Sequence, residues 1–139
     1  MGWYRDQILP RGIHLVLRRG EFADPRARAA AGLDGEVLEI GFGSGRNIPY
    51  YPAGVNRVLA VDPAAAGRTL AAKRAAAGAV PVEYAGSDAQ ALPVGDASVD
   101  SVLSTWTLCT IPDVARALAE IVRVLRPGGA LRFGARPGA

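Results

Sequence analysis

The sequence predicts an α/β fold, a three-layer αβα sandwich in which helices cover both faces of a mostly parallel, five-stranded sheet. Five short apolar segments alternate with helix-like segments along most of the chain, and this alternation is typical of βα units. The apolar segments lack a continuous polar face, as expected for parallel strands that helices cover on both sides. Three closely spaced glycines follow the first of these strands, which marks that end of the sheet as a place where a ligand can approach the backbone.

The 139 residues are expected to form a single domain, since a chain of this length can bury a hydrophobic core. We expect residues 1–34 to form an N-terminal helical cap and residues 35–139 to form the core. In the cap, Asp24 and Pro25 suit the N-cap and first position of a helix that ends near Gly32. Before them, apolar residues at mixed three- and four-residue steps predict an amphipathic helix. These residues are Ile8, Leu9, Ile13, Val16 and Leu17.

The core is expected to contain five strands and two long helices. The strands are residues 36–41, 57–62, 80–85, 98–104 and 130–135, and the helices are residues 63–78 and 113–125. Pro81 cannot donate a backbone hydrogen bond, so we place the third strand at an edge of the sheet. Gly78 closes the first helix, and the RPGG segment at residues 126–129 ends the second.

The composition argues against several classes of function. The single cysteine, Cys109, cannot form an intrachain disulfide, and no cluster of Cys and His offers a metal site. The net charge is +3, but no run of basic residues exceeds two, which argues against a nucleic-acid partner. No apolar run reaches the length of a membrane span and no signal peptide is recognisable. We therefore expect a cytoplasmic protein without stable membrane insertion.

The glycines Gly41, Gly43 and Gly45 follow the first core strand directly. Glycine accepts positive φ values in a tight turn, and the missing side chains let a ligand touch the backbone. In open parallel sheets, ligands bind beyond the carboxyl ends of the strands, which is where these glycines lie. A tight turn alone would also use glycine, so the interpretation as a binding site needs supporting residues.

Carboxylates lie in or next to three of the expected strands. Asp62 ends the second strand, where it can accept hydrogen bonds from ribose hydroxyl groups, and Asp88 follows the third, where it can accept one from an adenine amino group. Glu39 lies inside the first strand, and a buried carboxylate must be paired or hydrogen-bonded to be tolerated. Each residue alone is explained as a helix cap or a surface charge, but together they predict a nucleoside site.

The glycine spacing disfavours a nicotinamide-dependent oxidoreductase. The dinucleotide motif is G-x-G-x-x-G, and counted from Gly41 its third glycine would stand where this chain has Arg46. The sequence also lacks the G-K-S/T phosphate loop of nucleotide-hydrolysing proteins. Several carboxylates suit a cationic ligand better than a polyphosphate.

Four segments resemble the successive motifs of class I S-adenosylmethionine-dependent methyltransferases. They are VLEIGFGSGRN (37–47), VLAVDP (58–63), GSDAQALPVGDASVDSVLSTWTLC (86–109) and IVRVLRPGGALRF (121–133). The motifs are most similar to the methyltransferase type 11 group, which includes ubiquinone and menaquinone methyltransferases. Within it, TWTLCTI and NIPYYP resemble the methyltransferase-like 7 thiol methyltransferases. The resemblance implies a Rossmann-like fold, S-adenosylmethionine as cofactor and a small-molecule methyl acceptor such as a thiol.

The resemblance also implies roles for individual residues. The glycines would contact the methionine part of the cofactor, and Glu39 would help to hold its amino group. Asp62 would bind the ribose, and Asp88 the adenine. Thr105 and Trp106 would close over the sulfur. The full set of expected cofactor-binding residues is Glu39, Gly41, Gly43, Gly45, Asn47, Asp62, Pro63, Asp88, Ala89, Thr105 and Trp106.

No catalytic residue is assigned, because a thiolate acceptor needs no general base. His14 lies in the expected N-terminal helix and is better interpreted as a packing residue than as an acid or base. Cys109 is likewise better interpreted as a small buried hydrophobic residue. The aromatic residues that are candidates for the acceptor site are more simply explained by core packing. They are Trp3, Tyr4, Tyr50 and Tyr51.

The resemblance ends at the fifth strand. The family's sheet continues with a helix and two last strands that this sequence lacks. Every expected cofactor contact precedes that point, so a second hypothesis is a truncated S-adenosylmethionine-binding module without turnover. The fifth strand would then be an edge with unpaired backbone groups, which predicts a homodimer through residues 130–135.

Overall fold

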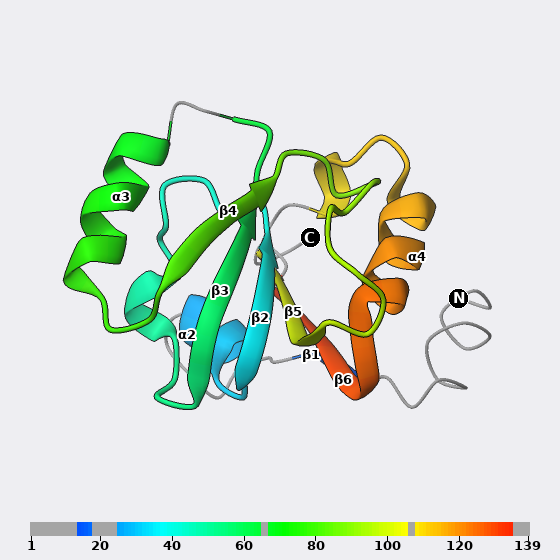
Figure 1. The fold of residues 1–139 in the computed structure, drawn as a ribbon, viewed down its shortest axis with the longest axis horizontal. Helices are drawn as coiled ribbons and strands as arrows, with labels where there is room; N and C mark the ends of the chain where they lie inside the picture. The colour runs from blue at the N-terminus through cyan, green and yellow to red at the C-terminus, as the bar shows by residue number, and fades with distance from the viewer. Residues whose placement is uncertain (1–13, 18–24, 65–66, 106–107, 135–139) are drawn as a thin grey trace.

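The structure of the protein, a computed structural model, describes residues 14–17, 25–64, 67–105 and 108–134. Six strands form one sheet in the order β1-β6-β5-β2-β3-β4, and each neighbouring pair is parallel (Figure 1). The strands are β1 His14–Leu17, β2 Gly35–Ile40, β3 Val55–Val61, β4 Val82–Gly86, β5 Val99–Thr105 and β6 Leu125–Gly134. The helices are α2 Pro25–Ala30, α3 Arg68–Ala77 and α4 Val114–Val124, with short 3-10 turns η2 Ile48–Tyr50 and η3 Leu108–Thr110.

Helices cover both faces of the sheet, which confirms the predicted α/β fold class. Successive residues of a strand point to opposite faces, and β2 shows this with two buried neighbours. Val37 packs in a cluster with residues of α2 and α3, such as Ala30 and Ala71. Leu38 packs on the other face in a cluster with residues of α4, such as Ile121. The two clusters form the core on either side of the sheet, and Figure 1 shows α3 and α4 on opposite sides of it.

Two boundaries of the last βα unit differ from the sequence prediction. The Asp113 carboxylate caps α4 by accepting a hydrogen bond from the backbone amide of Arg116 at 3.0 Å, and α4 ends at Val124. β6 begins at the next residue, so the RPGG segment belongs to the strand rather than to a separate loop. The register between β5 and β6 jumps from Val99–Leu125 to Ser101–Ala130. The segment is therefore an irregularity within the ladder, of the kind that extra residues in one strand produce.

The sheet has one strand more than the five that the sequence predicted, because His14–Leu17 is a strand and not part of a helix. It runs parallel to β6, with His14 opposite Ala130 and Leu17 opposite Phe133. A short apolar run does not distinguish helix from strand by periodicity alone, and the backbone groups of β6 supply partners that favour the strand. The rest of the expected N-terminal helix lies outside the described residues.

The position of β1 corrects the expectation of a free edge at residues 130–135. β6 is hydrogen-bonded to β5 on one side and to β1 on the other. The reason given for a homodimer through this strand therefore does not hold for residues 130–134, and dimerisation itself stays a prediction. The expected edge position of the strand after Pro81 is confirmed, since β4 ends the strand order.

Candidate functional site

The glycine loop begins where β2 ends. Gly41, Gly43 and Gly45 have φ values of 75°, 55° and 77°, the left-handed region in which residues with a side chain are strained. Gly41 donates its backbone N–H to the carbonyl oxygen of Val61 at 2.8 Å, so the loop starts beside the end of β3. Further along the loop, the Ser44 carbonyl oxygen accepts a bond of 2.6 Å from Arg74 on α3. The loop is thus fixed between the sheet and α3.

Asp62, directly after β3, is bonded to the middle of this loop. Its Oδ2 accepts a hydrogen bond of 2.8 Å from the Gly43 amide, and its Oδ1 accepts one of 2.6 Å from the Ala64 amide. The side chain is nearly buried, with 7% of its residue surface exposed. Two carboxylate oxygens offer about four acceptor positions in total, so these two bonds leave capacity for ligand hydroxyl groups.

The space next to Gly43 is open. A Cβ added there would find no heavy atom nearer than the Gly41 carbonyl oxygen at 3.9 Å and Asp62 Oδ2 at 4.0 Å, among atoms outside its own chain neighbours. By contrast, a Cβ at Gly67, the N-cap of α3, would lie 2.8 Å from the Gly43 carbonyl carbon. The loop therefore has α3 tightly against one side and open space beside the Asp62 carboxylate. A ligand can approach from the open side.

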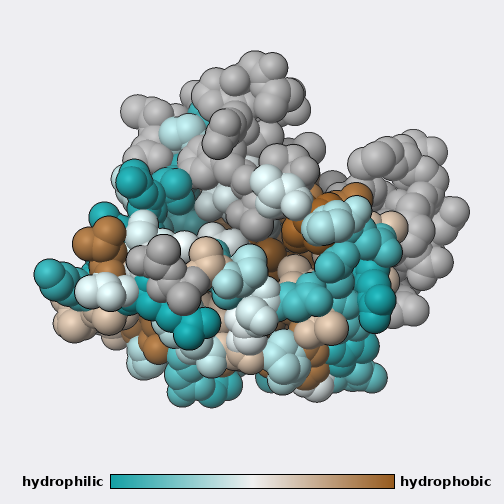
Figure 2. Space-filling view, turned by 90° about the horizontal axis from the view of Figure 1, so that it is seen from above, coloured by the Kyte–Doolittle hydropathy of each residue, from teal (hydrophilic) through white to brown (hydrophobic). Residues whose placement is uncertain are grey.

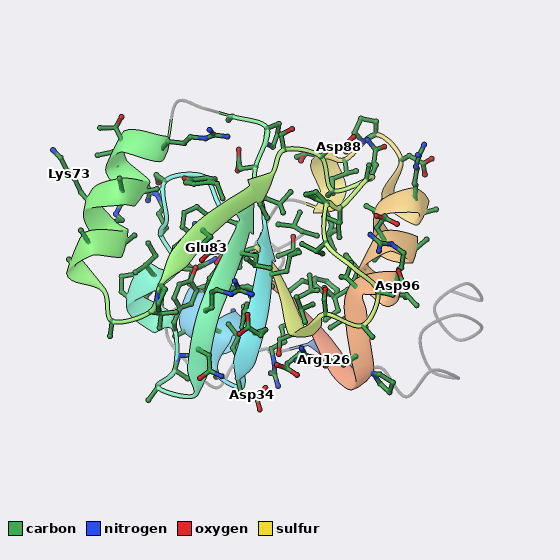
Figure 3. The ribbon with its side chains drawn as sticks, in the orientation of Figure 1. Asp34, Lys73, Glu83, Asp88, Asp96 and Arg126 are labelled. Atoms are coloured by element: carbon green, nitrogen blue, oxygen red, sulfur yellow. The ribbon has the colours of Figure 1, made fainter. Side chains whose placement is uncertain are left out.

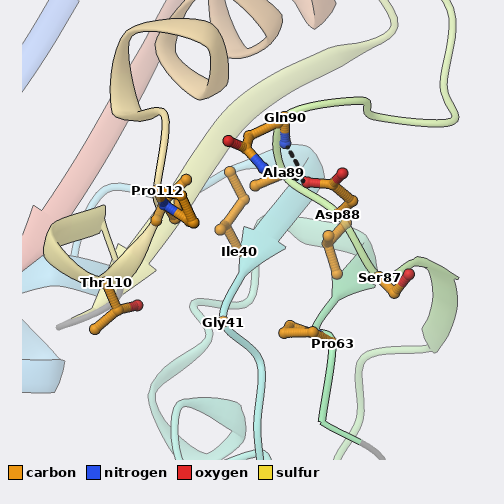
Figure 4. A pocket seen from close by; sticks show the side chains of 11 residues that line it. Ile40, Gly41, Pro63, Ser87, Asp88, Ala89, Gln90, Thr110 and Pro112 are labelled. Atoms are coloured by element: carbon orange, nitrogen blue, oxygen red, sulfur yellow. Dashed lines mark hydrogen bonds between the residues drawn. The ribbon is translucent and has the colours of Figure 1, made fainter.

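A cavity of about 350 Å³ adjoins the start of the glycine loop (Figure 4). Four of the residues that the resemblance implied line it, namely Gly41, Pro63, Asp88 and Ala89. The remaining lining residues come from the ends of β2 and β3, from the segment after β4 and from the segment around η3. These are Ile40, Val61, Ser87, Gln90, Thr110, Ile111 and Pro112. A volume of this size with mainly apolar walls is typical of a small-molecule site.

The view from above looks onto the face where the strands end, and it shows hydrophobic surface between hydrophilic residues (Figure 2). Asp88 lies toward this end of the molecule, whereas Arg126 lies at the opposite end (Figure 3). The exposed Asp88 carboxylate accepts hydrogen bonds from the Gln90 backbone amide at 2.8 Å and from Gln90 Nε2 at 3.2 Å. These bonds lower the pKa of Asp88. An ionised acceptor therefore stands at the cavity, where it can receive a ligand N–H.

Glu39 is buried on the face of β2 that α2 covers, with 1% of its surface exposed. Its Oε1 accepts a hydrogen bond of 2.6 Å from the Tyr51 hydroxyl, and its Oε2 accepts one of 3.1 Å from Asn47 Nδ2. Burial raises the pKa of Glu39 to about 7, and both hydrogen bonds act in the opposite direction. The expectation that a carboxylate in this apolar strand must be hydrogen-bonded is met.

Asn47 connects Glu39 to two more elements. Its Nδ2 also donates to Thr105 Oγ1 at 3.1 Å, and its Oδ1 accepts from Arg26 NH1 at 3.0 Å. The same Arg26 nitrogen lies 3.5 Å from Thr105 Oγ1. This network joins α2, β2, β5 and the loop around η2. It is formed by the buried Glu39, Asn47 and Thr105 and the half-buried Arg26 and Tyr51. None of these five residues lines the cavity, and the network holds the end of the glycine loop at Asn47 on the α2 side of the sheet. Contact of Glu39, Asn47 and Thr105 with the cofactor stays a prediction.

Sequence reasoning missed Arg26, and it considered Tyr51 as an acceptor-site candidate that core packing explains more simply. The need of buried Glu39 for donors was the one signal that could have indicated Tyr51. Arg26 gave no local signal, since its partner Thr105 is 79 residues away. Trp106 lies outside the described residues, as do the side chains of His14 and Cys109.

The described residues fit an adenosyl sulfonium. The apolar cavity walls suit a flat adenine ring, the Asp62 carboxylate beside Gly43 suits ribose hydroxyl groups, and the carboxylates suit a positive charge. Within the described part of the chain, no group of three or more His, Cys, Asp and Glu residues could hold a metal ion. Nor is any helix there long and apolar enough to cross a membrane.

Comparisons with known proteins agree with this fit. The family model described as "Methyltransferase domain" matches residues 38–133. Human thiol S-methyltransferase TMT1A is 34% identical over 135 residues, which cover 94% of this chain and 52% of the relative. Human thiol S-methyltransferase TMT1B is 35% identical over 114 residues, which cover 76% of this chain and 45% of the relative. The chain thus spans about half the length of these curated relatives.

A solved structure extends the likeness to the fold. The crystal structure of an S-adenosylmethionine-dependent methyltransferase from Mesorhizobium loti aligns with a TM-score of 0.63 at 27% identity, covering 78% of this chain and 51% of that one. The matched family model spans most of the chain, from β2 to β6. This chain therefore belongs to the family of S-adenosylmethionine-dependent methyltransferases.

Proposed function

We propose that this protein binds S-adenosylmethionine at the glycine loop and transfers its methyl group to a small-molecule acceptor, with a thiol as the first candidate. The observation that carries the proposal is the bond between Asp62 and Gly43 next to a cavity lined by Gly41, Pro63 and Asp88. It supports the proposal because a carboxylate that can accept hydrogen bonds from ribose hydroxyl groups lies beside the open space at Gly43, next to a mainly apolar cavity that suits adenine.

In this proposal the cofactor supplies a methyl group already activated on a positively charged sulfur. The protein's own contribution is to hold the two reacting atoms in line and to exclude water. Asp62 and the glycine loop fix the adenosine, and the buried network around Asn47 keeps the far end of the loop in place. The acceptor sulfur forms the new bond to the methyl carbon, and the electron pair of the broken bond stays on the cofactor's sulfur.

The relatives support a thiol as acceptor, because TMT1A and TMT1B are both named thiol S-methyltransferases. A thiolate needs no general base at the moment of transfer.

A second candidate is an S-adenosylmethionine-binding module without turnover. It is favoured by one observation, namely that the chain spans about half the length of the relatives. The glycine loop, Asp62 and the cavity residues that carry the proposed site lie within the described residues. The two candidates therefore predict the same ligand but differ in the chemistry.

Two measurements separate these candidates from each other and from a nicotinamide enzyme. Isothermal titration of the full chain is expected to show binding of S-adenosylhomocysteine and no binding of NADH. Transfer of a radiolabelled methyl group to a panel of thiols, phenols and quinols is expected to label the thiols first. Binding without transfer to any acceptor supports the module, whereas NADH binding or no binding of S-adenosylhomocysteine contradicts both.

A further inference from the structure

We propose that the protein docks on an anionic lipid surface through a face that α3 and the glycine loop form together. This face, called the α3–loop face, consists of the cations Arg46, Lys73 and Arg74 and the apolar Leu70. The proposal goes beyond the methyl transfer proposed above and does not depend on it. It concerns docking on the headgroups of a bilayer, without a segment that crosses it.

The helix and the loop form one continuous surface. Arg74 on α3 donates a hydrogen bond of 2.6 Å to the carbonyl oxygen of Ser44 in the loop. A Cβ added at Gly45 would lie 3.3 Å from the Cα of Ala71, so the loop backbone packs directly on the helix. Arg46 is the next residue of the loop and is exposed. The cation of the loop and those of the helix can therefore meet the same partner.

Positive charge on this side of the molecule is not balanced by acids. The segment from Ile40 to Val82 has five cations and one acid, Asp62, which is 7% exposed and accepts two backbone hydrogen bonds. Arg57 forms an ion pair with an acid of β2, and Arg68 lies over the Tyr84 ring, 4.6 Å from its centre. The other three are the cations of the α3–loop face, and none of them forms an ion pair in the described part of the chain.

An apolar side chain lies among these charges. Leu70 is 53% exposed, more than any other large hydrophobic residue that the structure describes. Lys73 and Arg74 follow it at spacings of three and four residues, so they are its neighbours on the helix surface. A membrane surface meets both features, because anionic headgroups attract the cations and the outer acyl region accepts an apolar side chain.

The remaining residues of the helix favour a lipid surface over a macromolecule. A protein interface is usually anchored by a cluster of aromatic or large apolar side chains, whereas the exposed neighbours on α3 are small, such as Ala72 and Ala76. Single-stranded nucleic acids add stacking on aromatic side chains, and α3 contains no aromatic residue. A lipid surface needs only the charges and one shallow apolar contact.

The charge distribution orients the molecule toward such a surface. Lys73 lies on the α3 side of the sheet, whereas the exposed acids Asp88 and Asp96 lie on the other side, toward α4 (Figure 3). A protein with charges separated in this way turns its positive side toward an anionic surface before contact. The α3–loop face is therefore the side expected to meet the headgroups.

Co-sedimentation of the full chain with lipid vesicles tests the proposal. Neutral phosphatidylcholine vesicles are compared with vesicles that also contain phosphatidylglycerol, each at low and at high salt. Each cation near an anionic surface contributes about fivefold in affinity. The wild type is therefore expected to bind the anionic vesicles about ten- to a hundredfold more tightly at low salt, and to lose most of this preference at high salt, which screens the charges.

Five variants locate the contact. Lys73→Gln and Arg46→Gln are each expected to weaken binding to anionic vesicles about fivefold, and Lys73→Arg to leave it unchanged. Leu70→Gln is expected to weaken it about threefold or more, because an apolar contact is lost. Arg126→Gln is the matched control for net charge, since Arg126 is an exposed cation at the opposite end of the molecule from Asp88 (Figure 3). It is expected to bind as the wild type does.

Several results would overturn the proposal. Equal binding of the wild type to neutral and anionic vesicles is one, and an equal loss in Lys73→Gln and Arg126→Gln is another, because net charge alone would then explain binding. A short duplex RNA at the same phosphate concentration is the rival ligand. If RNA binds as tightly as the vesicles and Leu70→Gln has no effect on vesicle binding, the face attracts polyanions in general and the lipid proposal is wrong.

Two controls keep the test decisive. Circular dichroism checks that each variant is folded, and if one variant is not, the comparison of vesicles with the wild type and the remaining variants decides. Titration with S-adenosylhomocysteine is a separate measurement on the same chain. Failure to bind vesicles therefore leaves the proposed methyl transfer untouched, and failure to bind S-adenosylhomocysteine leaves the docking proposal untouched.

Discussion

The backbone amide of Gly43 donates a hydrogen bond of 2.8 Å to Oδ2 of Asp62, although the two residues are 19 positions apart in the chain. This bond joins the loop after β2 to the end of β3, so the shape of the loop depends on the carboxylate that we expect to bind ribose. The Asp62 side chain thus holds the loop and is also the group that we expect to bind the ribose. Its removal is the first test of the site.

We predict that Asp62→Ala weakens binding of S-adenosylhomocysteine by about 1–3 kcal/mol, because it removes acceptors for buried hydroxyl groups and frees the loop. Isothermal titration measures the effect. Asp96→Ala is the matched control, since the Asp96 side chain is exposed and pairs with Arg123 away from the loop. Unchanged affinity in Asp62→Ala would mean that the ribose binds elsewhere.

The contact between α3 and the loop gives a steric prediction. A Cβ at Gly67 would lie 2.8 Å from the Gly43 carbonyl carbon and 2.9 Å from its oxygen, both backbone atoms that cannot rotate away. Gly67→Ala must therefore shift the glycine loop, and we expect affinity for S-adenosylhomocysteine to fall about tenfold or more, in line with the cost of overpacking. Gly95→Ala, where a Cβ meets nothing within 4 Å, is expected to bind normally. Equal affinities for the two variants would show that the loop does not depend on this contact.

Glu39 gives a prediction about pH. Its pKa is raised by burial from 4.5 to about 7 in the folded protein. Across that window the folded state holds more protons than the unfolded chain, so the free energy of unfolding falls as the pH rises, by about 3 kcal/mol in total. Glu39→Gln cannot titrate and is expected to lose this part of the slope. Urea denaturation at several pH values measures it, and parallel slopes for wild type and variant would rule out the titration.

The hydrogen bond between Tyr51 and Glu39 gives a second prediction about pH. Tyr51→Phe removes the donor to Glu39 Oε1 and leaves a buried acceptor unsatisfied, which we expect to lower the free energy of unfolding by about 1–3 kcal/mol at pH 8. The loss should shrink toward pH 5, where protonated Glu39 has less need of a donor. Tyr84→Phe, on the exposed edge strand β4, serves as control. A loss in Tyr51→Phe that is independent of pH would contradict the coupling between the two residues.

The pairing of β1 with β6 predicts a change in association. A chain lacking residues 1–17 leaves one side of β6 without its described partner, and an unpaired edge is a template for pairing with another chain. Sedimentation velocity is expected to show self-association that increases with concentration in this variant, beyond that of the full chain. The same distribution for both chains would indicate that β1 does not protect the edge.

Four of the residues that line the cavity, Gly41, Pro63, Asp88 and Ala89, could be predicted because their signals are local. Gly41 follows an apolar strand, and Pro63 and Asp88 follow the next two strands, so the order of elements alone places them at one edge of a parallel sheet. The burial of Glu39 could be predicted in the same way. The core strands and helices were also foreseen, since their apolar patterns are strong.

The rest depends on contacts that the sequence pattern does not show. His14–Leu17 is a strand because β6 offers it backbone partners, a choice that its own periodicity leaves open. Arg26 reaches Thr105 and Asn47 only once α2 packs against the sheet. Tyr51 bonds to Glu39 because the loop around η2 folds back over β2. Side-chain partners this far apart in sequence are set by the tertiary fold and not by local preference.

A crystal structure of the chain with S-adenosylhomocysteine tests the proposed site most directly. We expect the ribose hydroxyl groups within hydrogen-bonding distance of Asp62 and the adenine in the cavity next to Pro63 and Asp88. Ligand density away from the glycine loop, or an adenine outside this cavity, would contradict the proposed cofactor site.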